Sequence, residues 1–190
     1  MKFTKLSIPD VILCEPNVFG DDRGYFSETF RLDKLEEFVG HSFDFCQDNE
    51  SKSSYGVLRG LHYQLATFAQ TKLVRVIKGK VLDVAVDIRE GSETFGKHVA
   101  VELSEQNKQQ LLVPRGFAHG FVVLSEEAIF SYKVDSYYSP EHDRGVAFND
   151  KSLNIDWQIP VEDFKLSEKD IIQPKLKDAE CFDIKQKLYV

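Results

Sequence analysis

The chain has 190 residues, of which 42% are hydrophobic, 12% aromatic and 29% charged, close to the averages of globular proteins. The formal net charge of −7 argues against a nucleic acid or an anionic membrane surface as partner, although a local basic pocket could still bind a phosphorylated small molecule. No apolar run approaches the roughly 18–20 residues of a membrane-spanning helix. We therefore expect one domain over residues 1–190, without a nucleic-acid or membrane partner.

The cysteines and the amino terminus bear on location. Cys14, Cys46 and Cys181 form an odd, widely spaced set without a CxxC pair. The first residues lack the apolar core of a signal peptide. Free thiols in a reducing cytoplasm are the simplest interpretation.

The first predicted element is a helix over residues 31–39. Apolar residues recur there at helical spacing, and Gly40 suits the position just after a helix. A second short helix is expected after Ser167, a candidate N-cap, and Pro174 limits its length. Helix is therefore the minor component.

Between these helices the chain reads as short strands. Residues 72–77 and 81–88 are joined by Lys78-Gly79-Lys80, and such a short link containing glycine predicts a β-hairpin. In residues 81–88 the side chains alternate, with Leu82, Val84, Val86 and Ile88 on one face and Val81, Asp83, Ala85 and Asp87 on the other. Further strands are expected at residues 98–103, 110–113, 120–124 and 128–134. About eight short strands favour an antiparallel sandwich or barrel over a βαβ fold.

The densest group of potentially reactive residues lies in residues 56–64. Arg59 and His62 are three positions apart, so in a regular strand they point to opposite faces. They share a site only if a bulge or bend at the glycines intervenes. Otherwise the segment is a strand with an exposed arginine and a core histidine.

A second group lies in residues 113–121, where proline and glycine indicate a tight loop that opens into a strand. Such a loop either presents His119 to a site or contains an incidental histidine. The histidines show no metal-ligand spacing, because His62 is followed by Tyr63 and Gln64 rather than by a second histidine. No GxSxG, GxxxxGK[ST] or GxGxxG motif occurs. Acid–base chemistry without a metal or cofactor, or simple binding, remains.

Eight segments that follow one another in order carry a resemblance over roughly residues 20–175. They are residues 21–28, 47–51, 56–64, 72–76, 113–121, 132–133, 148–150 and 166–170. With them the chain closely resembles the dTDP-4-dehydrorhamnose 3,5-epimerases of the cupin superfamily. The resemblance implies an all-β fold, a cupin-type jelly roll (double-stranded β-helix) with a few short peripheral helices. It also implies a homodimer without cofactor or metal.

The resemblance further implies an isomerase of dTDP-L-rhamnose biosynthesis. It would convert dTDP-4-dehydro-6-deoxy-D-glucose to dTDP-4-dehydro-L-rhamnose by inverting C3 and C5. Both protons lie α to the C4 ketone, so their removal gives an enolate and needs only a base, an acid and a donor near the oxygen. By resemblance His62 is the base, Asp170 orients it, Tyr132 is the acid, and Lys72 stabilises the enolate oxygen.

Substrate binding carries over in the same way. Arg23 and Arg59 resemble residues that bind the diphosphate, for which arginine is well suited. The remaining expected contacts to nucleotide or sugar are Glu28, Gln47, Asp48, Asn49, Lys72, His119, Tyr138, Asp143 and Lys169. Among them, Tyr138 is a candidate for stacking on the base.

Alternatives remain open. Taken alone, Tyr132 is a packing residue of a strand, Lys72 a solvated strand start, and Asp170 a carboxylate at a helix start. The chain departs from the family pattern in residues 65–70, at Phe148 where tryptophan is usual, and at Asp143 where glutamate is common. The competing functions are a single-position epimerase or other isomerase of such sugars, a non-catalytic sugar-nucleotide-binding jelly roll, and a storage cupin.

Overall fold

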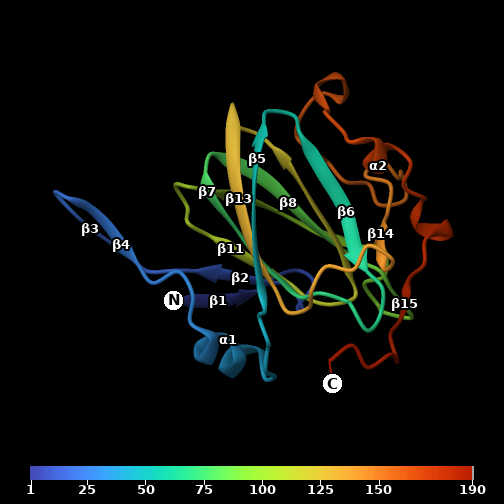
Figure 1. The fold of residues 1–190 in the computed structure, drawn as a ribbon, viewed down its shortest axis with the longest axis horizontal. Coiled ribbons are helices and arrows are strands. Elements are labelled where there is room, and N and C mark those ends of the chain that lie inside the picture. The colour runs from blue at the N-terminus through green and yellow to red at the C-terminus, as the bar shows by residue number, and fades with distance from the viewer. Residues whose placement is uncertain (190) are drawn as a thin grey trace.

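Two antiparallel sheets face each other and form the body of the molecule (Figure 1). The computed structural model describes residues 1–189. The six-stranded sheet contains, in spatial order, β1 Lys2–Lys5, β2 Ile12–Glu15, β11 Gln110–Val113, β7 Lys72–Lys78, β13 Glu127–Val134 and β5 Gln47–Ser54. The five-stranded sheet contains β10 His98–Ser104, β8 Lys80–Asp87, β12 Phe117–Val123, β6 Leu58–Gln64 and β14 Asp143–Gly145.

The remaining elements are small and peripheral. They are the hairpin of β3 Val18–Asp21 with β4 Gly24–Ser27, the parallel pair β9 Arg89–Glu90 and β15 Phe182–Asp183, the helices α1 Leu32–Val39 and α2 Glu168–Ile171, and the 3₁₀ turns Val161–Asp163 and Leu176–Asp178. No helix within residues 1–189 is long and apolar enough to cross a membrane. The expected all-β fold with a few short helices is confirmed.

Side-chain alternation in β8 builds two layers of the core. As expected, Val81 and Ala85 face the space between the sheets, where they pack with buried residues such as Val74, Phe121 and Phe130. The opposite face of β8 contributes Leu82, Val84, Val86 and Ile88 to a second cluster, which the C-terminal segments cover with Trp157, Leu176 and Phe182. Each sheet is therefore apolar on both faces wherever another layer covers it.

The outer face of the six-stranded sheet is covered by α1. The helix buries Leu35 against Ile12, Leu73 and Leu112, and it ends as predicted at Gly40, whose left-handed backbone closes the last turn with a hydrogen bond to the Glu36 carbonyl. Ser167 is the cap of α2, as predicted, because its hydroxyl accepts the Asp170 backbone N–H.

The predicted hairpin of residues 72–88 is wrong. β7 pairs with β11 and β13, whereas β8 pairs with β10 and β12, so the link at Gly79 carries the chain from one sheet to the other. Gly79 has a positive φ of 78°, and a Cβ there would lie 2.0 Å from the Glu127 carbonyl oxygen. A turn between facing sheets uses the same glycine signal as a hairpin, and only the pairing of distant strands distinguishes the two.

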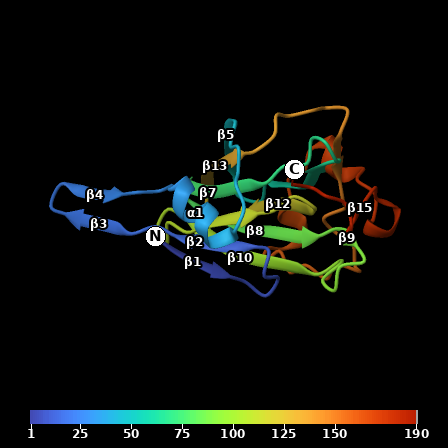
Figure 2. The same cartoon turned by 90° about the horizontal axis from the view of Figure 1, so that it is seen from below.

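The β3–β4 hairpin lies apart from both sheets, and Figures 1 and 2 show it projecting away from them. Its aromatic side chains are exposed, at 62% for Phe19, 62% for Tyr25 and 69% for Phe26. An isolated two-stranded hairpin is marginally stable in water. This segment therefore offers an unburied apolar surface.

Candidate active site

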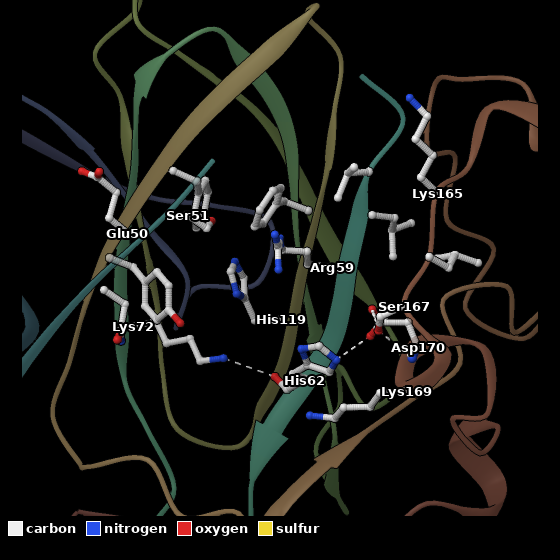
Figure 3. A pocket seen from close by; sticks show the side chains of 17 residues that line it. Glu50, Ser51, Arg59, His62, Lys72, His119, Lys165, Ser167, Lys169 and Asp170 are labelled. Atoms are coloured by element: carbon white, nitrogen blue, oxygen red, sulfur yellow. Dashed lines mark hydrogen bonds and ion pairs between the residues drawn. The ribbon is translucent and has the colours of Figure 1, made fainter. Parts of the chain in front are cut away.

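A cavity of about 650 Å³ opens between the two sheets. Its walls come from β5, β7 and β13 on one side, β6 and β12 on the other, and residues 165–170 along the rim. Eight residues that the sequence singled out line it together, namely Asn49, Arg59, His62, Lys72, His119, Tyr132, Lys169 and Asp170 (Figure 3). Residues far apart in the chain thus meet in one site.

A bulge in β6 explains how Arg59 and His62 reach the same cavity. His119 pairs with His62 and Phe121 with Arg59, so two residues of β6 oppose the single Gly120 of β12. The extra residue shifts the side-chain alternation by one position. Gly60 makes this possible, because its φ is +126° and a Cβ there would lie 2.5 Å from the Gly120 Cα. The structure therefore meets the condition under which the sequence predicts that Arg59 and His62 share a site.

His62 and Asp170 form a close pair. The His62 Nε2 lies 2.6 Å from Asp170 Oδ1, and Asp170 is only 4% exposed. Burial alone would raise the pKa of Asp170, but hydrogen bonds from His62 and Ser167 hold it below its ordinary value. An ionised carboxylate only accepts hydrogen bonds, so Nε2 carries the proton and Nδ1 is left as a free base facing the cavity (Figure 3).

Tyr132 and Lys72 stand on the sheet that faces His62. Burial raises the pKa of Tyr132, and Asp143 adds to this while Arg59 opposes it, so the phenol holds its proton at neutral pH. Burial lowers the pKa of Lys72 to about 8, against the opposing effect of Asp143 and Asp83. The Lys72 ammonium donates to the His62 backbone carbonyl at 3.4 Å and therefore reaches across the cavity.

A second histidine–carboxylate pair lies deeper in the cavity. His119 Nε2 donates to the Asp83 carboxylate at 2.9 and 3.0 Å, and Asp83 is fully buried. Sequence reasoning identified His119 but missed Asp83. The signal was present, because Asp83 is a charged residue on the face that Val81 and Ala85 direct into the core.

Positive charge in the cavity is incompletely paired. The Arg59 Nε donates to Ser53 Oγ at 3.1 Å, and within residues 1–189 neither Arg59 nor Lys72 has a carboxylate within ion-pair distance. Lys165, an exposed residue that sequence reasoning missed, adds another cation to the lining. This arrangement suits a ligand with negative charge.

Other predicted binding residues border the cavity without lining it. Tyr138 donates to Asp143 Oδ2 at 3.1 Å, and Lys169 forms a close ion pair with the same carboxylate. Gln47 donates to Asn49 Oδ1 at 2.8 Å and so supports a cavity residue. Asp143 and Gln47 therefore act on lining residues from behind or beside them.

Three predicted binding residues lie outside the cavity of this chain. Asp48 points to the outer face of its strand, where Lys133 binds its carboxylate at 2.9 Å. Arg23, whose side chain is 90% exposed, lies on the projecting hairpin beside Asp21. Glu28 lies near Arg31 and Lys34 at the start of α1.

Within residues 1–189, no group of three histidine, cysteine, aspartate or glutamate side chains is arranged to hold a metal ion.

Phe148 packs against Phe164 in the outer cluster beneath the five-stranded sheet. Phe148, which stands where the family usually has tryptophan, therefore lies outside the cavity lining.

The family model of dTDP-4-dehydrorhamnose 3,5-epimerase matches residues 5–178. The dTDP-4-dehydrorhamnose 3,5-epimerase of Shigella flexneri is 56% identical over 96% of this chain and 99% of its own length. The chain belongs to the dTDP-4-dehydrorhamnose 3,5-epimerase family. This confirms the family and the isomerase class expected from the sequence.

Solved structures agree with this assignment. The crystal structure of the Elizabethkingia anophelis enzyme of that name superposes with a TM-score of 0.90 at 57% identity, covering 94% of this chain and 97% of its own. The Legionella pneumophila 3,5-epimerase in complex with dTDP-4-keto-L-rhamnose gives 0.93 at 44% identity, covering 97% and 99%. These neighbours confirm the cupin jelly roll. A 3′-monoepimerase from Streptomyces bikiniensis in complex with dTDP-quinovose gives 0.86 at 33% identity, covering 90% and 86%.

Proposed function

We propose that the chain converts dTDP-4-dehydro-6-deoxy-D-glucose to dTDP-4-dehydro-L-rhamnose by inverting C3 and C5. The observation that carries this proposal is the 2.6 Å pair of His62 with the buried Asp170, which faces Tyr132 across a cavity containing Lys72. A base and an acid on opposite walls, with a cation between two sheets, are what inversion next to a ketone requires.

His62 takes the proton from carbon. Its Nδ1 accepts the proton, while Nε2 stays bonded to Asp170, whose carboxylate stabilises the imidazolium that forms. The electrons of the C–H bond move toward C4 and give an enolate. Ser167 donates to Asp170 Oδ2 at 2.7 Å and so fixes the carboxylate that holds the histidine.

Tyr132 returns a proton to the opposite face of the sugar, which inverts the carbon. A phenol whose pKa is raised by burial remains protonated until the enolate draws the proton away. Lys72 lies where its ammonium can bind the C4 oxygen as negative charge develops there. Its lowered pKa of about 8 still leaves most of the amine protonated at pH 7.

The diphosphate of the substrate is bound by the unpaired cations. Arg59 carries a guanidinium with one of its donors held by Ser53 and the others free for phosphate oxygens. Lys165 lies on the rim, as does Lys169, whose ammonium is already paired with Asp143. Tyr138, which donates to the same carboxylate, offers an exposed ring to the nucleobase.

The second candidate is inversion at a single carbon. The similarity to a 3′-monoepimerase, at 33% identity and a TM-score of 0.86, favours keeping it. The outcome depends on whether the half-inverted sugar changes its ring shape inside the cavity.

Proton exchange in D₂O separates these functions. The substrate is incubated with the protein in D₂O, and NMR follows deuterium at C3 and C5, with His62→Ala as control. Deuterium at both carbons supports double inversion, and deuterium at one carbon supports a monoepimerase. Binding without exchange at either carbon contradicts both and leaves a non-catalytic binding protein.

We also propose that the enzyme acts as a homodimer in which the β3–β4 hairpin of one copy reaches the cavity of the other. Its exposed aromatic residues need a partner surface, and Arg23 and Glu28 on or beside it find no place in the cavity of their own chain. β1 is also an unpaired edge of the six-stranded sheet and can extend a neighbouring sheet.

Mixed dimers test this arrangement. Arg23→Ala and His62→Ala are each expected to be nearly inactive, yet a mixture refolded together regains activity, because one site of each mixed dimer combines an intact His62 with an intact Arg23. A mixture that stays inactive while size-exclusion chromatography shows mixed dimers contradicts action across subunits. A monomer on the column contradicts the dimer itself.

The proposed location is the cytoplasm. Cys14, Cys46 and Cys181 are all free thiols in the structure, and burial raises the pKa of each. Cys14 is buried and the other two are partly buried, and such protonated free thiols are compatible with a reducing compartment.

A further inference from the structure

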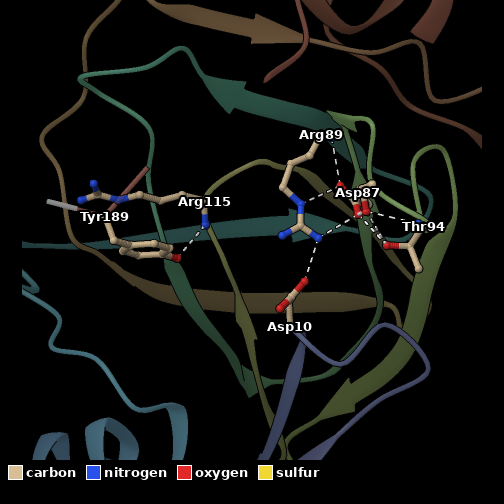
Figure 4. A network of polar contacts seen from close by, with 7 residues as sticks. Asp10, Asp87, Arg89, Thr94, Arg115 and Tyr189 are labelled. Atoms are coloured by element: carbon tan, nitrogen blue, oxygen red, sulfur yellow. Dashed lines mark hydrogen bonds and ion pairs between the residues drawn. The ribbon is translucent and has the colours of Figure 1, made fainter. Parts of the chain in front are cut away.

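The C-terminal residues Leu188 and Tyr189 are bound into the protein by polar contacts. The Tyr189 hydroxyl accepts the Arg115 backbone N–H at 3.0 Å (Figure 4). It also shares a hydrogen bond of 2.9 Å with Thr71 Oγ1. The ring lies 4.3 Å from His41, centroid to centroid, and 5.2 Å below the Arg115 guanidinium. The tail thus has a fixed place in the fold.

These contacts continue into a closed set that we call the tail network, formed by Thr71, Arg115, Asp135, Leu188 and Tyr189. The Arg115 guanidinium donates to the Leu188 carbonyl at 2.6 Å and to Asp135 Oδ2 at 3.2 Å. The other oxygen of Asp135 accepts the Thr71 backbone N–H at 2.6 Å. Thr71 is fully buried, and both its N–H and its hydroxyl are bound within this network.

The network meets the proposed machinery at β7 and β13. Thr71 immediately precedes Lys72, the first residue of β7, and Asp135 follows the end of β13, which carries Tyr132. The Lys72 side chain is long, and within residues 1–189 its one hydrogen bond is the 3.4 Å contact to the His62 carbonyl. The position of its ammonium therefore depends on the backbone from which it starts.

We infer that Tyr189 is a positioning residue for Lys72: its hydroxyl holds Thr71, and Thr71 fixes the start of β7 from which the ammonium reaches the substrate oxygen. This inference rests on the proposed function, in which Lys72 binds the C4 oxygen. A small displacement of a catalytic group is enough to slow a reaction by up to about 10²-fold. The last residues of the chain thereby take part in turnover without touching the substrate.

A neighbouring set of contacts provides the matched control. The loop network, formed by Asp10, Asp87, Arg89, Ser92 and Thr94, has similar buried hydrogen bonds, and Figure 4 shows it beside Arg115 and Tyr189. Thr94 Oγ1 donates to Asp87 Oδ2 at 2.6 Å. This network joins β2's entry loop to the end of β8, and it has no bond to Thr71.

The experiment compares Tyr189→Phe, Thr71→Val and the double variant with Thr94→Val. Tyr189→Phe keeps the ring and removes the hydroxyl, and we expect kcat to fall threefold to tenfold with KM changed less than twofold. Thr71→Val removes the other side of the same hydrogen bond, so the double variant is expected to be no slower than the slower single variant. Thr94→Val is expected to lower Tm and leave kcat within twofold. Thr71→Ser, which retains the hydroxyl, is expected to restore kcat.

Three outcomes overturn the inference. One is a Tyr189→Phe variant with the kcat of the unmodified protein. Another is a fall in kcat that Thr94→Val reproduces at the same loss of Tm, since that indicates general loosening. A third is a Thr71→Ser variant as slow as Thr71→Val. If the unmodified protein exchanges deuterium at neither C3 nor C5, the proposed function fails and this inference with it, whereas exchange with an unaltered Tyr189→Phe rejects the positioning role alone.

Discussion

The cavity and the loop network both contain charged side chains. Within residues 1–189, the loop network pairs its arginine with carboxylates, whereas the cavity leaves two basic side chains without such a partner. In the loop network Arg89 binds Asp87 and Asp10, and Asp87 also accepts hydrogen bonds from Ser92 and Thr94. In the cavity, Arg59 and Lys72 lack a carboxylate partner within the described chain. Charges that the fold satisfies by itself stabilise the fold, whereas charges that it leaves open are available to a ligand.

This comparison predicts different losses in the two regions. The largest expected effect is that of His62→Ala, which removes the proposed base. Turnover is expected to fall about 10³-fold or more, because general acid–base catalysis contributes about 10²–10⁴. Nucleotide binding, measured by calorimetry with dTDP, is expected to stay largely unchanged.

The control for this variant is His98→Ala, which removes a half-buried histidine of β10 outside the cavity. It should retain kcat within a factor of two. Loss of folding, or of all dTDP binding, in His62→Ala would contradict the assignment of His62 as the base.

Lys72→Met is expected to lower kcat about 10²–10³-fold, since removal of one preorganised donor at a developing oxyanion costs about 2.7–4 kcal/mol. The same change removes a cation whose pKa is depressed by burial, so the folded state should gain stability and Tm should not fall. Steady-state kinetics and calorimetry on one preparation test both parts.

Lys165→Met provides the comparison within the cavity, because Lys165 is an exposed cation on the rim. It is expected to raise KM more than it lowers kcat. A Lys72→Met variant with normal kcat and a raised KM would mean that Lys72 binds the substrate without stabilising the enolate.

Arg89→Met should produce the reverse pattern. Asp87 is fully buried, and removal of its ion-pair partner is expected to destabilise the fold by about 3 kcal/mol, a Tm decrease of about 6–12 °C. kcat at 25 °C should stay within twofold. Lys78→Met, which breaks an exposed pair with Glu127, should lower Tm much less, because water screens the attraction between exposed charges. Equal losses of Tm in these two variants would refute the distinction between satisfied and exposed charges.

The final prediction concerns the pH dependence of turnover. Lys72 has a pKa lowered to about 8, so it is protonated below that pH and neutral above it. kcat/KM, which reports the free enzyme, should therefore fall above about pH 8 and approach a tenfold decrease per pH unit. Asp143, Asp83 and Lys169 are the charged groups that influence this amine. Persistence of the same alkaline decrease in Lys72→Met would assign it to another group.

Much of the fold followed from local patterns. The two faces of β8 and the end of α1 at Gly40 were predictable, because alternation and glycine caps are short-range effects. β5 was missed, since its sequence Gln47–Ser54 is entirely polar and it forms a sheet edge. Its Asn49 and Ser51 line the cavity. A strand that faces a polar cavity instead of the core lacks the alternating apolar residues by which strands are predicted.

The site was predictable only with the family resemblance. Residue patterns alone identify His62 and Arg59, but they place the two in one site only if the strand contains a bulge. The register shift at Gly60 depends on contact with Gly120, which is distant in the chain. Asp83 and Lys165 belong to no motif, and only the assembled barrel brings them to the cavity or to His119. Arg23 and Glu28 lie outside the cavity of their own chain, and their place in a site rests on the proposed dimer.

The change of sheet at Gly79 has a consequence for folding kinetics. β7 ends at Lys78, and both of its partners come much later in the chain, since β11 starts at Gln110 and β13 follows it. β8 likewise pairs only with strands that come later in the chain. No hairpin forms across Gly79, so each pairing of β7 closes a long loop and loses chain entropy before it gains energy. Formation of the six-stranded sheet should accordingly be slow compared with a helical protein of equal length, and synthesis of β13 should precede it.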